Sequence, residues 1–210
     1  MSKILSIGAG VMGTAITIPA VSNGHHAKII GTSFDEEIIN SINQNSVHPK
    51  LNVQLTNTTS LLFNEMKQED IDESDVIVIG INSSGIDWFI NLIKNFNIVN
   101  KKFLIVTKGL YMNEKKELDI FPNKIKNEIQ QDINLTAVTG PCKAIELAKK
   151  NLTNICFVNS DLDTAIDLAN LFRNDYYVIK TQTDLLGAEF CAALKNVYAI
   201  AVGYSQTFFL

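Results

Sequence analysis

The stretch Lys3-Ile-Leu-Ser-Ile-Gly-Ala-Gly-Val-Met-Gly-Thr-Ala15 decides the fold. It begins as a short apolar run typical of a strand, and a helical pattern follows its glycines. Gly8, Gly10 and Gly13 have the G-x-G-x-x-G spacing. The first glycine of that pattern permits a tight turn, the second lets a pyrophosphate approach the backbone, and the third lets the helix pack on the strand. Amides at the helix start would meet the phosphate charge. The stretch therefore predicts a dinucleotide site rather than a plain turn.

The composition is that of an ordinary globular protein. The chain has 210 residues, of which 46% are hydrophobic and 19% charged. Its net charge of -4 provides no basic field for nucleic acid. The N-terminus enters a strand without a signal-peptide pattern, and an apolar run at 197–210 is too short to span a membrane. These features predict a cytoplasmic protein with no membrane span.

The cysteines and histidines do not form a metal motif. The cysteines have no C-x-x-C spacing, so we expect buried, reduced thiols in a cytosolic protein. The histidines have no metal-ligand spacing, and we expect them on the surface. These residues are Cys142, Cys156, Cys191, His25, His26 and His48.

Strand and helix patterns alternate through about residue 180, which predicts a Rossmann-like, doubly wound, mainly parallel α/β sheet with its ligand at the carboxyl ends of the strands. Expected strands are 3–7, 27–31, 51–55, 75–81, 102–107, 135–138, 154–158 and 176–179. Expected helices are 14–22, 35–44, 60–67, 86–96, 118–131, 144–150 and 162–172. From residue 184 one long apolar helical pattern follows, with no further strand. We therefore expect a nucleotide-binding domain at 1–183 and the first helix of an incomplete helical domain at 184–210.

Three stretches beyond the glycines point to chemistry, and each has a plainer interpretation. Lys108 in Thr107-Lys-Gly109 stands at the sheet edge, or is a solvated loop lysine. The Gly140-Pro-Cys142 loop could meet an anion with its amides, although Cys142 could simply fill space. Lys195 lies among apolar neighbours that would disfavour its charged form, or its side chain could extend to water. Asp184 and Glu189 could serve only the start of the last helix.

Taken together, these motifs resemble the NAD(P)-dependent glycerol-3-phosphate dehydrogenase family. The resemblance runs from Gly-Ala-Gly-x-x-Gly-Thr-Ala through Ser-Asp-Val-Ile-Val-Ile, Thr-Lys-Gly and Gly-Pro-x-x-Ala. It ends at Asp-x-x-Gly-x-Glu and Ala-Leu-Lys-Asn-Val-Tyr-Ala-Ile-Ala-Val-Gly, so it covers essentially the whole chain.

The resemblance implies a role for each matching position. Lys195 would be the proton donor and acceptor. Substrate-binding positions would be Lys108, Gly140, Cys142, Lys195 and Asn196. Positions that bind NAD(P)H would be Gly8, Ala9, Gly10, Val11, Met12, Gly13, Thr32, Ser33, Lys108 and Ala144. The implied reaction is reversible hydride transfer between the nicotinamide and dihydroxyacetone phosphate, which gives sn-glycerol 3-phosphate for phospholipid synthesis or cytosolic redox balance.

The chain also departs from the family pattern. Family members are longer, and their helical domain supplies an Asp and an Arg-Asn pair that have no counterpart here. We therefore expect a form truncated within that domain, and a non-catalytic nucleotide-binding remnant or another Rossmann-type hydroxy-acid dehydrogenase remains an alternative. Thr32 and Ser33 do not decide between NAD and NADP, and Asp35 is interpreted as a helix cap. The oligomeric state is open, with a homodimer as one option.

Overall fold

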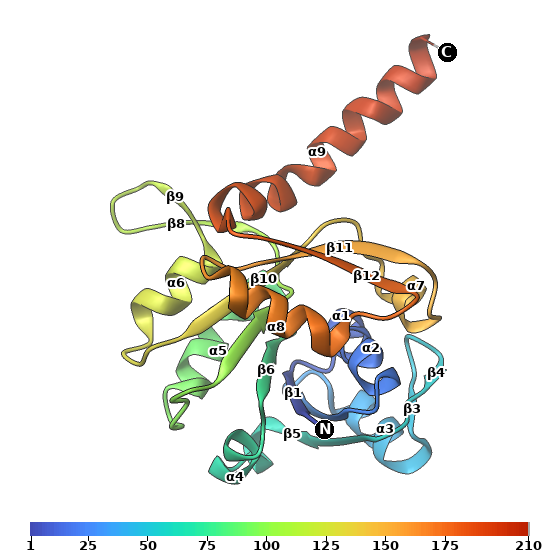
Figure 1. The fold of residues 1–210 in the computed structure, drawn as a ribbon, viewed down its shortest axis with the longest axis vertical. Coiled ribbons are helices and arrows are strands. Elements are labelled where there is room, and N and C mark those ends of the chain that lie inside the picture. The colour runs from blue at the N-terminus through green and yellow to red at the C-terminus, as the bar shows by residue number, and fades with distance from the viewer. Residues whose placement is uncertain (210) are drawn as a thin grey trace.

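A computed structural model describes residues 1–209 and contains one eight-stranded sheet (Figure 1). The order across this sheet is β12-β11-β10-β7-β6-β1-β2-β5. The strands are β1 (Lys3–Ile7), β2 (His26–Gly31), β5 (Thr58–Leu62), β6 (Val76–Ile79), β7 (Lys102–Ile105), β10 (Asn134–Thr139), β11 (Thr153–Val158) and β12 (Tyr177–Gln182). Two small hairpins pair β3 (Val47–His48) with β4 (Val53–Gln54), and β8 (Leu110–Met112) with β9 (Leu118–Ile120).

The sheet has the strand order expected of a dinucleotide-binding fold. Counted in the order in which they enter the sheet, the six strands from β5 to β10 run 3-2-1-4-5-6, and all their pairings are parallel. The chain reverses only at the β10–β11 pairing, which is antiparallel. The order switches between β1 and β6, where such sheets bind ligands. The predicted fold class is confirmed.

Helices cover both faces of the sheet. Their bounds are α1 (Val11–Ala15), α2 (Thr17–Ser22), α3 (Glu36–Asn45), α4 (Gln68–Asp72), α5 (Ile86–Ile93), α6 (Phe121–Glu128), α7 (Ala144–Ala148), α8 (Leu162–Phe172) and α9 (Leu185–Phe209). Short 3-10 turns stand at Phe63–Glu65 and Ser83–Gly85. Adjacent residues of one strand enter different cores: Val76 and Val78 face α1, α2 and α8, whereas Ile77 and Ile79 face α5 and α6. This explains why β6 is apolar at every position.

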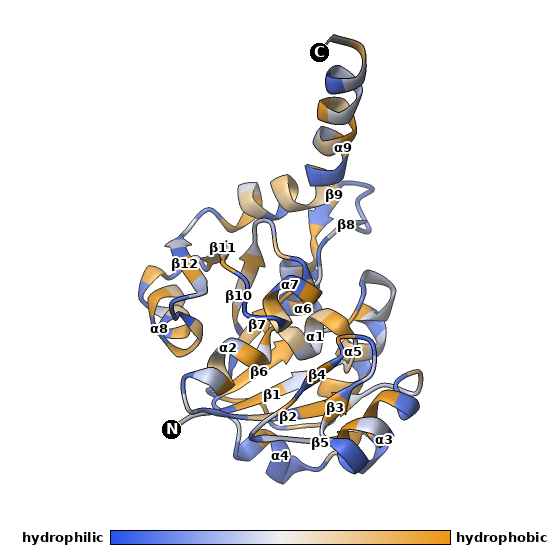
Figure 2. Ribbon diagram, turned by 90° about the vertical axis from the view of Figure 1, so that its right-hand side faces the viewer, coloured by the Kyte–Doolittle hydropathy of each residue, from blue (hydrophilic) through white to orange (hydrophobic). Residues whose placement is uncertain are grey.

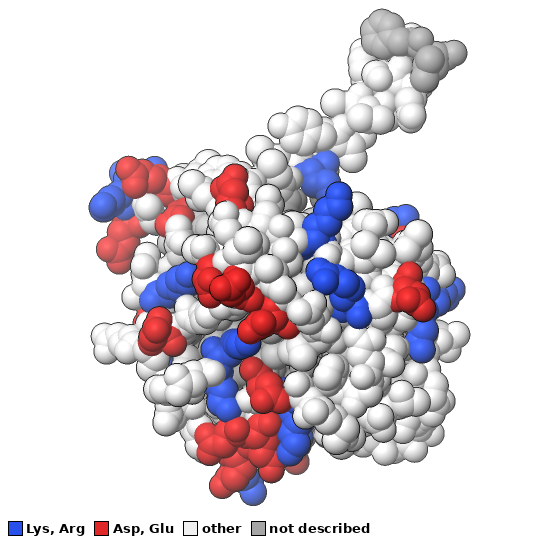
Figure 3. Space-filling model, in the orientation of Figure 1, with Lys and Arg blue, Asp and Glu red and all other residues white. Residues whose placement is uncertain are grey.

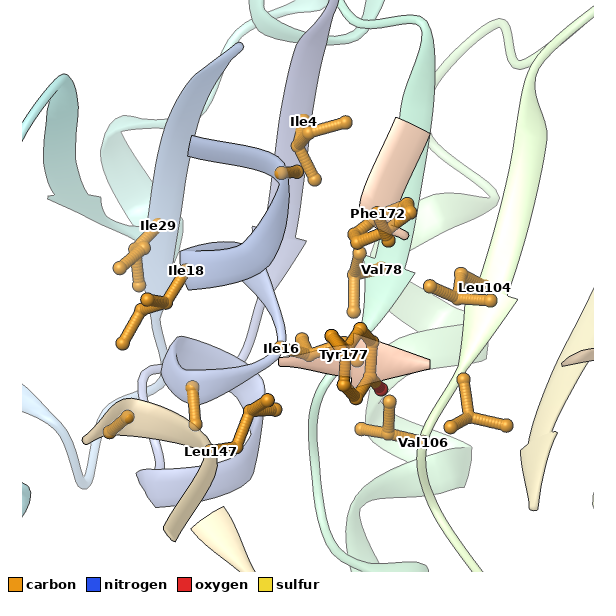
Figure 4. Packing of buried hydrophobic residues seen from close by; sticks show 14 of the residues in the cluster. Ile4, Ile16, Ile18, Ile29, Val78, Leu104, Val106, Leu147, Phe172 and Tyr177 are labelled. Carbon is orange, nitrogen blue, oxygen red and sulfur yellow. The ribbon is translucent and has the colours of Figure 1, made fainter. Parts of the chain in front are cut away.

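Large side chains fill the first of these cores. Figure 4 shows Ile16 and Tyr177 close together, with Phe172 and Leu104 nearby. Phe172 also meets Phe157 edge-on at 5.7 Å between ring centroids. These contacts hold α8 against the sheet and bury the side chain of Tyr177 from the edge strand β12, after which the chain enters α9.

Two predicted helices are wrong in whole or in part. Residues 58–62 form strand β5 at the sheet edge, paired with β2, where a helix over 60–67 was predicted. Pairing with β2 outweighs the weak helical pattern of this short segment. The helix predicted from residue 118 begins at Phe121, with Pro122 in its first turn, and residues 118–120 belong to a hairpin. The strand predicted over 51–55 is reduced to Val53–Gln54.

Helix α9 leaves the body of the protein (Figure 1). Leu185 and Ala188 are buried, but Val197, Tyr198 and Ile200 are 61%, 64% and 74% exposed. Figure 2 shows hydrophobic residues along the projecting part. Among the described residues, α9 alone is long and apolar enough to cross a membrane by length and composition. The prediction of no membrane span considered only residues 197–210, which are the last part of the helix expected at 184–210. Only 17% of the most apolar 18-residue stretch of α9 is buried.

Charge is mixed over the visible face. Figure 3 shows acidic side chains gathered over α4 and lysines or arginine distributed elsewhere. The projecting part of α9 is uncharged, since residues 196–210 contain no Lys, Arg, Asp or Glu. No broad basic surface appears in this view.

Candidate functional site

The glycine turn joins β1 to α1 at the switch point of the sheet. Gly8 has φ +111°, which favours glycine, and a side chain there would lie 2.6 Å from the Gly80 carbonyl oxygen. A side chain at Gly13 would overlap the carbonyl oxygen of Gly8. At Gly10, by contrast, a Cβ would meet nothing within 4 Å. Two glycines therefore serve close packing, and Gly10 leaves open space for a ligand.

Side chains from three other positions hold Ala9 at the centre of this turn. Its N–H donates to Asp35 Oδ2 at 3.4 Å, and its carbonyl accepts from Thr14 Oγ1 at 3.3 Å. His48 Nε2 lies 2.9 Å from the same carbonyl oxygen. Since His48 Nδ1 accepts from the Leu51 N–H, Nε2 carries the proton. These hydrogen bonds fix the backbone conformation of the turn at Ala9.

Two sequence interpretations are corrected at this turn. His48 was expected on the surface, but it is fully buried, and burial lowers its pKa. Asp35 occupies the position before α3, yet its side chain makes no capping bond. Its carboxylate instead accepts from the N–H and Oγ1 of Thr32, at 2.9 and 2.8 Å. An acidic residue about 20 positions after such glycines typically meets the ribose of a dinucleotide. This spacing could have revealed that Asp35 lies beside the turn.

The turn opens into a cleft of about 420 Å³. Thr32 and Ser33, two predicted cofactor positions, line it together with Trp88. Its other lining residues are Gly8, Gly10, Phe34, Asp35, Gly80, Ile81, Asn82, Ser84 and Gly85. The N–H groups of Gly10, Val11 and Met12 make no hydrogen bond to another described residue, so they remain available to an anion. An open Gly10 beside free amides and a cleft at the switch point fit a dinucleotide.

The sequence did not predict the far wall of this cleft. Asn82 caps the turn at Ser83–Gly85 by accepting from the Gly85 N–H at 3.0 Å and from Ser84 Oγ at 2.8 Å. Trp88 follows in α5, where Phe63 meets it edge-on at 5.6 Å between ring centroids. Neither residue belongs to the motifs that identified the site.

The predicted substrate residues lie further along the same edge of the sheet. Thr107 follows β7 and donates from Oγ1 to the Ile81 carbonyl at 2.6 Å, which ties this loop to the first cleft. Lys108 Nζ donates to the Gly140 carbonyl at 3.0 Å. A second cleft, of about 600 Å³, lies between the 139–141 loop and α9 and is lined by Gly140 and Lys195 among others. The structure thus brings Lys108, Gly140 and Lys195 together.

The pKa values of Lys108 and Cys142 depend on burial and on the charges around them. Burial lowers the pKa of Lys108, and the nearby Lys195 ammonium lowers it further. Burial also raises the pKa of the Cys142 thiol, which stands close enough to Lys108 for their charges to interact. The half-buried Lys108 is therefore not the solvated loop lysine of the plainer interpretation.

Lys195 differs from its predicted environment. Of its two interpretations, apolar surroundings or a side chain that extends to water, the structure favours the second, because α9 projects from the domain and leaves Lys195 exposed. Leu194 beside it is 41% exposed. Asn196 is also exposed. Ala144 is the first residue of α7, which packs against α1, so it lies near the glycine turn.

Asp184 and Glu189 have different roles. Asp184 caps α9 as predicted, because Oδ1 accepts from the Gly187 N–H at 2.9 Å. Glu189 was given the same interpretation, but it is 1% exposed and neither carboxylate oxygen has a hydrogen-bond partner among the described residues. An acidic residue between Ala188 and Phe190 in an apolar run was the available signal.

The cysteines are free thiols, and their predicted burial is only partly correct. Cys142 and Cys156 are half-buried, but Cys191 is exposed. Over residues 1–209, no three His, Cys, Asp or Glu side chains form a group that could hold a metal ion.

The family match and the relatives similar in sequence point to one family. The family described as NAD-dependent glycerol-3-phosphate dehydrogenase N-terminus matches residues 3–165. The NADP(+)-dependent glycerol-3-phosphate dehydrogenase of Archaeoglobus fulgidus is 30% identical over 201 residues, covering 94% of this chain and 58% of that protein. The glycerol-3-phosphate dehydrogenase [NAD(P)+] of Mycoplasma mobile is 32% identical over 212 residues, covering 98% and 61%. The chain thus spans about three fifths of the length of these relatives.

Solved structures share the fold. Glycerol-3-phosphate dehydrogenase from Coxiella burnetii superposes with a TM-score of 0.83 at 19% identity, covering 98% of this chain and 61% of that one. The Plasmodium falciparum enzyme gives 0.81 at 20% identity, covering 98% and 58%. With the glycine turn and the family match over most of the chain, the protein belongs to the family of NAD-dependent glycerol-3-phosphate dehydrogenase N-terminal domains.

Proposed function

We propose that this chain carries the NAD(P)H-binding part of a glycerol-3-phosphate dehydrogenase, which interconverts dihydroxyacetone phosphate and sn-glycerol 3-phosphate. The observation that carries the proposal is the glycine turn, where Gly10 leaves open space beside free amides at the switch point. The family match and the named relatives support the assignment. Since the chain spans only part of those relatives, the reaction of the whole protein is part of the proposal.

In this proposal the chain binds and orients its cofactor along the first cleft. The pyrophosphate lies at Gly8 to Gly13, with Ala9, Val11 and Met12 contributing backbone. Thr32 and Ser33 face the adenosine ribose, and Lys108 and Ala144 complete the contacts. When bound, NAD(P)H supplies the hydride.

The two lysines serve the substrate in the second cleft. Lys108, Gly140, Cys142 and Asn196 bind dihydroxyacetone phosphate. Its carbonyl oxygen gains negative charge as the reaction proceeds, and the Lys195 ammonium stabilises that charge and supplies the proton. The mutual proximity of Lys108 and Lys195 supports this arrangement, because two ammonium groups attract a phosphate-bearing substrate.

We further propose that residues 1–183 form the nucleotide-binding domain and that α9 begins a helical substrate domain. The sheet ends with β12, and the start of α9 reaches the second core through Leu185 and Ala188, while the rest of α9 projects away from the sheet, which supports this boundary. Free thiols are compatible with a cytoplasmic location.

Titration of the chain with NADH and with NADPH, followed by nicotinamide fluorescence, tests the proposal. We expect saturable binding of at least one of them. Reduction of dihydroxyacetone phosphate is then assayed on this chain and on a longer version. Binding without turnover in either form would favour a non-catalytic remnant, and absence of binding by both nucleotides would contradict the proposed function.

A further inference from the structure

Glu189 is the most unusual charged group in the described part of the chain. It is 1% exposed, and both carboxylate oxygens lack a hydrogen-bond partner among the described residues. A buried ionised carboxyl without partners is costly, so native structures normally pair it. Such a group requires an explanation that capping of α9 does not provide.

The charged group that acts on Glu189 is Lys108. The Lys108 ammonium counteracts the effect of burial on the Glu189 carboxyl, and the carboxylate in turn favours the charged form of Lys108. Lys108 uses one hydrogen bond, to Gly140, and an ammonium has three donors. Its remaining donors are therefore available to a neighbouring carboxylate.

Other titratable groups near this pair do not replace Glu189. Lys195 stands further along α9 and repels Lys108, and Cys142 faces Lys108 from the loop before α7. The β8–β9 hairpin, which also packs against α9, carries Tyr111 and Asp119. The Tyr111 hydroxyl donates to Asp119 Oδ2 at 3.3 Å, so these two side chains pair with each other.

We propose that Glu189 is a positioning residue of the substrate site, whose buried carboxylate is the charge partner of the Lys108 ammonium. It offsets the repulsion that Lys195 exerts on Lys108, so that the charged form of Lys108 is favoured beside a phosphate-bearing ligand. This role rests on the proposed function. Burial raises the pKa of Glu189 to about 7, so this carboxyl gains or loses its charge near neutral pH.

The test measures the reactivity of the Lys108 amine, which needs neither cofactor nor turnover. Amines are acetylated briefly between pH 6 and 10, and mass spectrometry compares Lys108 with the exposed Lys94 as an internal reference. In Glu189→Gln the pKa of Lys108 should fall, which raises its relative labelling at pH 7.5 by about threefold or more. Glu189→Asp, which keeps the charge, should restore part of the original behaviour.

Glu146→Gln is the matched control. This exposed carboxyl acts on Cys142 but not on Lys108, so its loss should leave Lys108 labelling unchanged. Should Glu189→Gln fail to fold, the pKa of the Glu189 carboxyl is measured by carbon-detected NMR in Lys108→Met, where loss of the ammonium should raise it. Unchanged Lys108 reactivity in folded Glu189→Gln, or an unchanged Glu189 pKa in Lys108→Met, would overturn the proposal. Because no nucleotide is present, failure here is separate from failure of the NADH titration.

Discussion

Replacement of Glu189 by Gln should stabilise the protein above neutral pH and leave its stability almost unchanged at low pH. Burial raises the pKa of this carboxyl from 4.5 to about 7, although Lys108 opposes the shift. Gln has the shape of the protonated acid but cannot ionise. The substitution therefore removes the cost of a buried charge together with the smaller attraction to the Lys108 ammonium, and the net pKa shift already includes both.

The size and sign of the effect follow from proton linkage. Between pH 4.5 and 7 the folded protein holds a proton at Glu189 that the unfolded chain has released, so the free energy of unfolding decreases as pH rises through this window. The full shift corresponds to about 3 kcal/mol, at 1.36 kcal/mol per pKa unit. Glu189→Gln should recover this amount at pH 8 and almost none at pH 4.5.

Thermal unfolding followed by circular dichroism at pH 5 and pH 8 measures the difference. For a domain of this size, about 3 kcal/mol corresponds to an increase in Tm of about 6–12 °C at pH 8. Glu146→Gln, at an exposed position, should show no such pH-dependent gain. A Glu189→Gln protein that is equally stabilised at both pH values, or destabilised at pH 8, would show that the carboxyl is not held in a costly buried state.

Other substitutions separate folding from binding. Gly10→Val should fold normally yet lose nucleotide binding, whereas Gly13→Ala should lower the free energy of unfolding by about 1–3 kcal/mol, because its side chain overlaps neighbouring backbone. Denaturation and NADH titration of both variants measure the two effects. Unchanged NADH binding in Gly10→Val would mean that the site is misplaced. His48→Ala should destabilise the protein by about 1–3 kcal/mol and weaken NADH binding, since the Ala9 carbonyl loses its buried donor; full NADH affinity would show that this bond does not shape the turn. In a catalytically competent form, Lys195→Ala should abolish dihydroxyacetone phosphate reduction while NADH affinity stays within about a few-fold, and normal turnover would refute its role. The exposed apolar face of α9 predicts self-association, and sedimentation that gives a monomer at high concentration would count against it.

The sequence predicted the central fold well where its signals are periodic and local. The glycine turn and the buried run of β6 led to the correct sheet class, and α8 has the predicted bounds of Leu162–Phe172. The helix predicted near residue 60 failed because strand β5 is defined by its pairing with β2, which lies far away in the sequence. The reversed direction of β11 likewise depends on pairing and leaves no periodic signal.

At the candidate site, the sequence identified residue types but not their surroundings. Lys108 donates a hydrogen bond to Gly140, which their separate motifs did not predict, and the structure brings Lys195 near them. The exposure of Lys195 depends on what covers α9, which its own neighbours along the chain could not reveal. The burial of Glu189 and of His48 likewise arises from packing between separate elements.

Trp88 gives the first cleft an optical label of its own. It is the single tryptophan among the 210 residues, and it lines the same cleft as Gly8 and Gly10 of the glycine turn. All tryptophan emission of the protein therefore originates beside the proposed nucleotide site. Reduced nicotinamide absorbs in the region where tryptophan emits, so energy transfer from this one position would report occupancy of the cleft without any labelling of the chain.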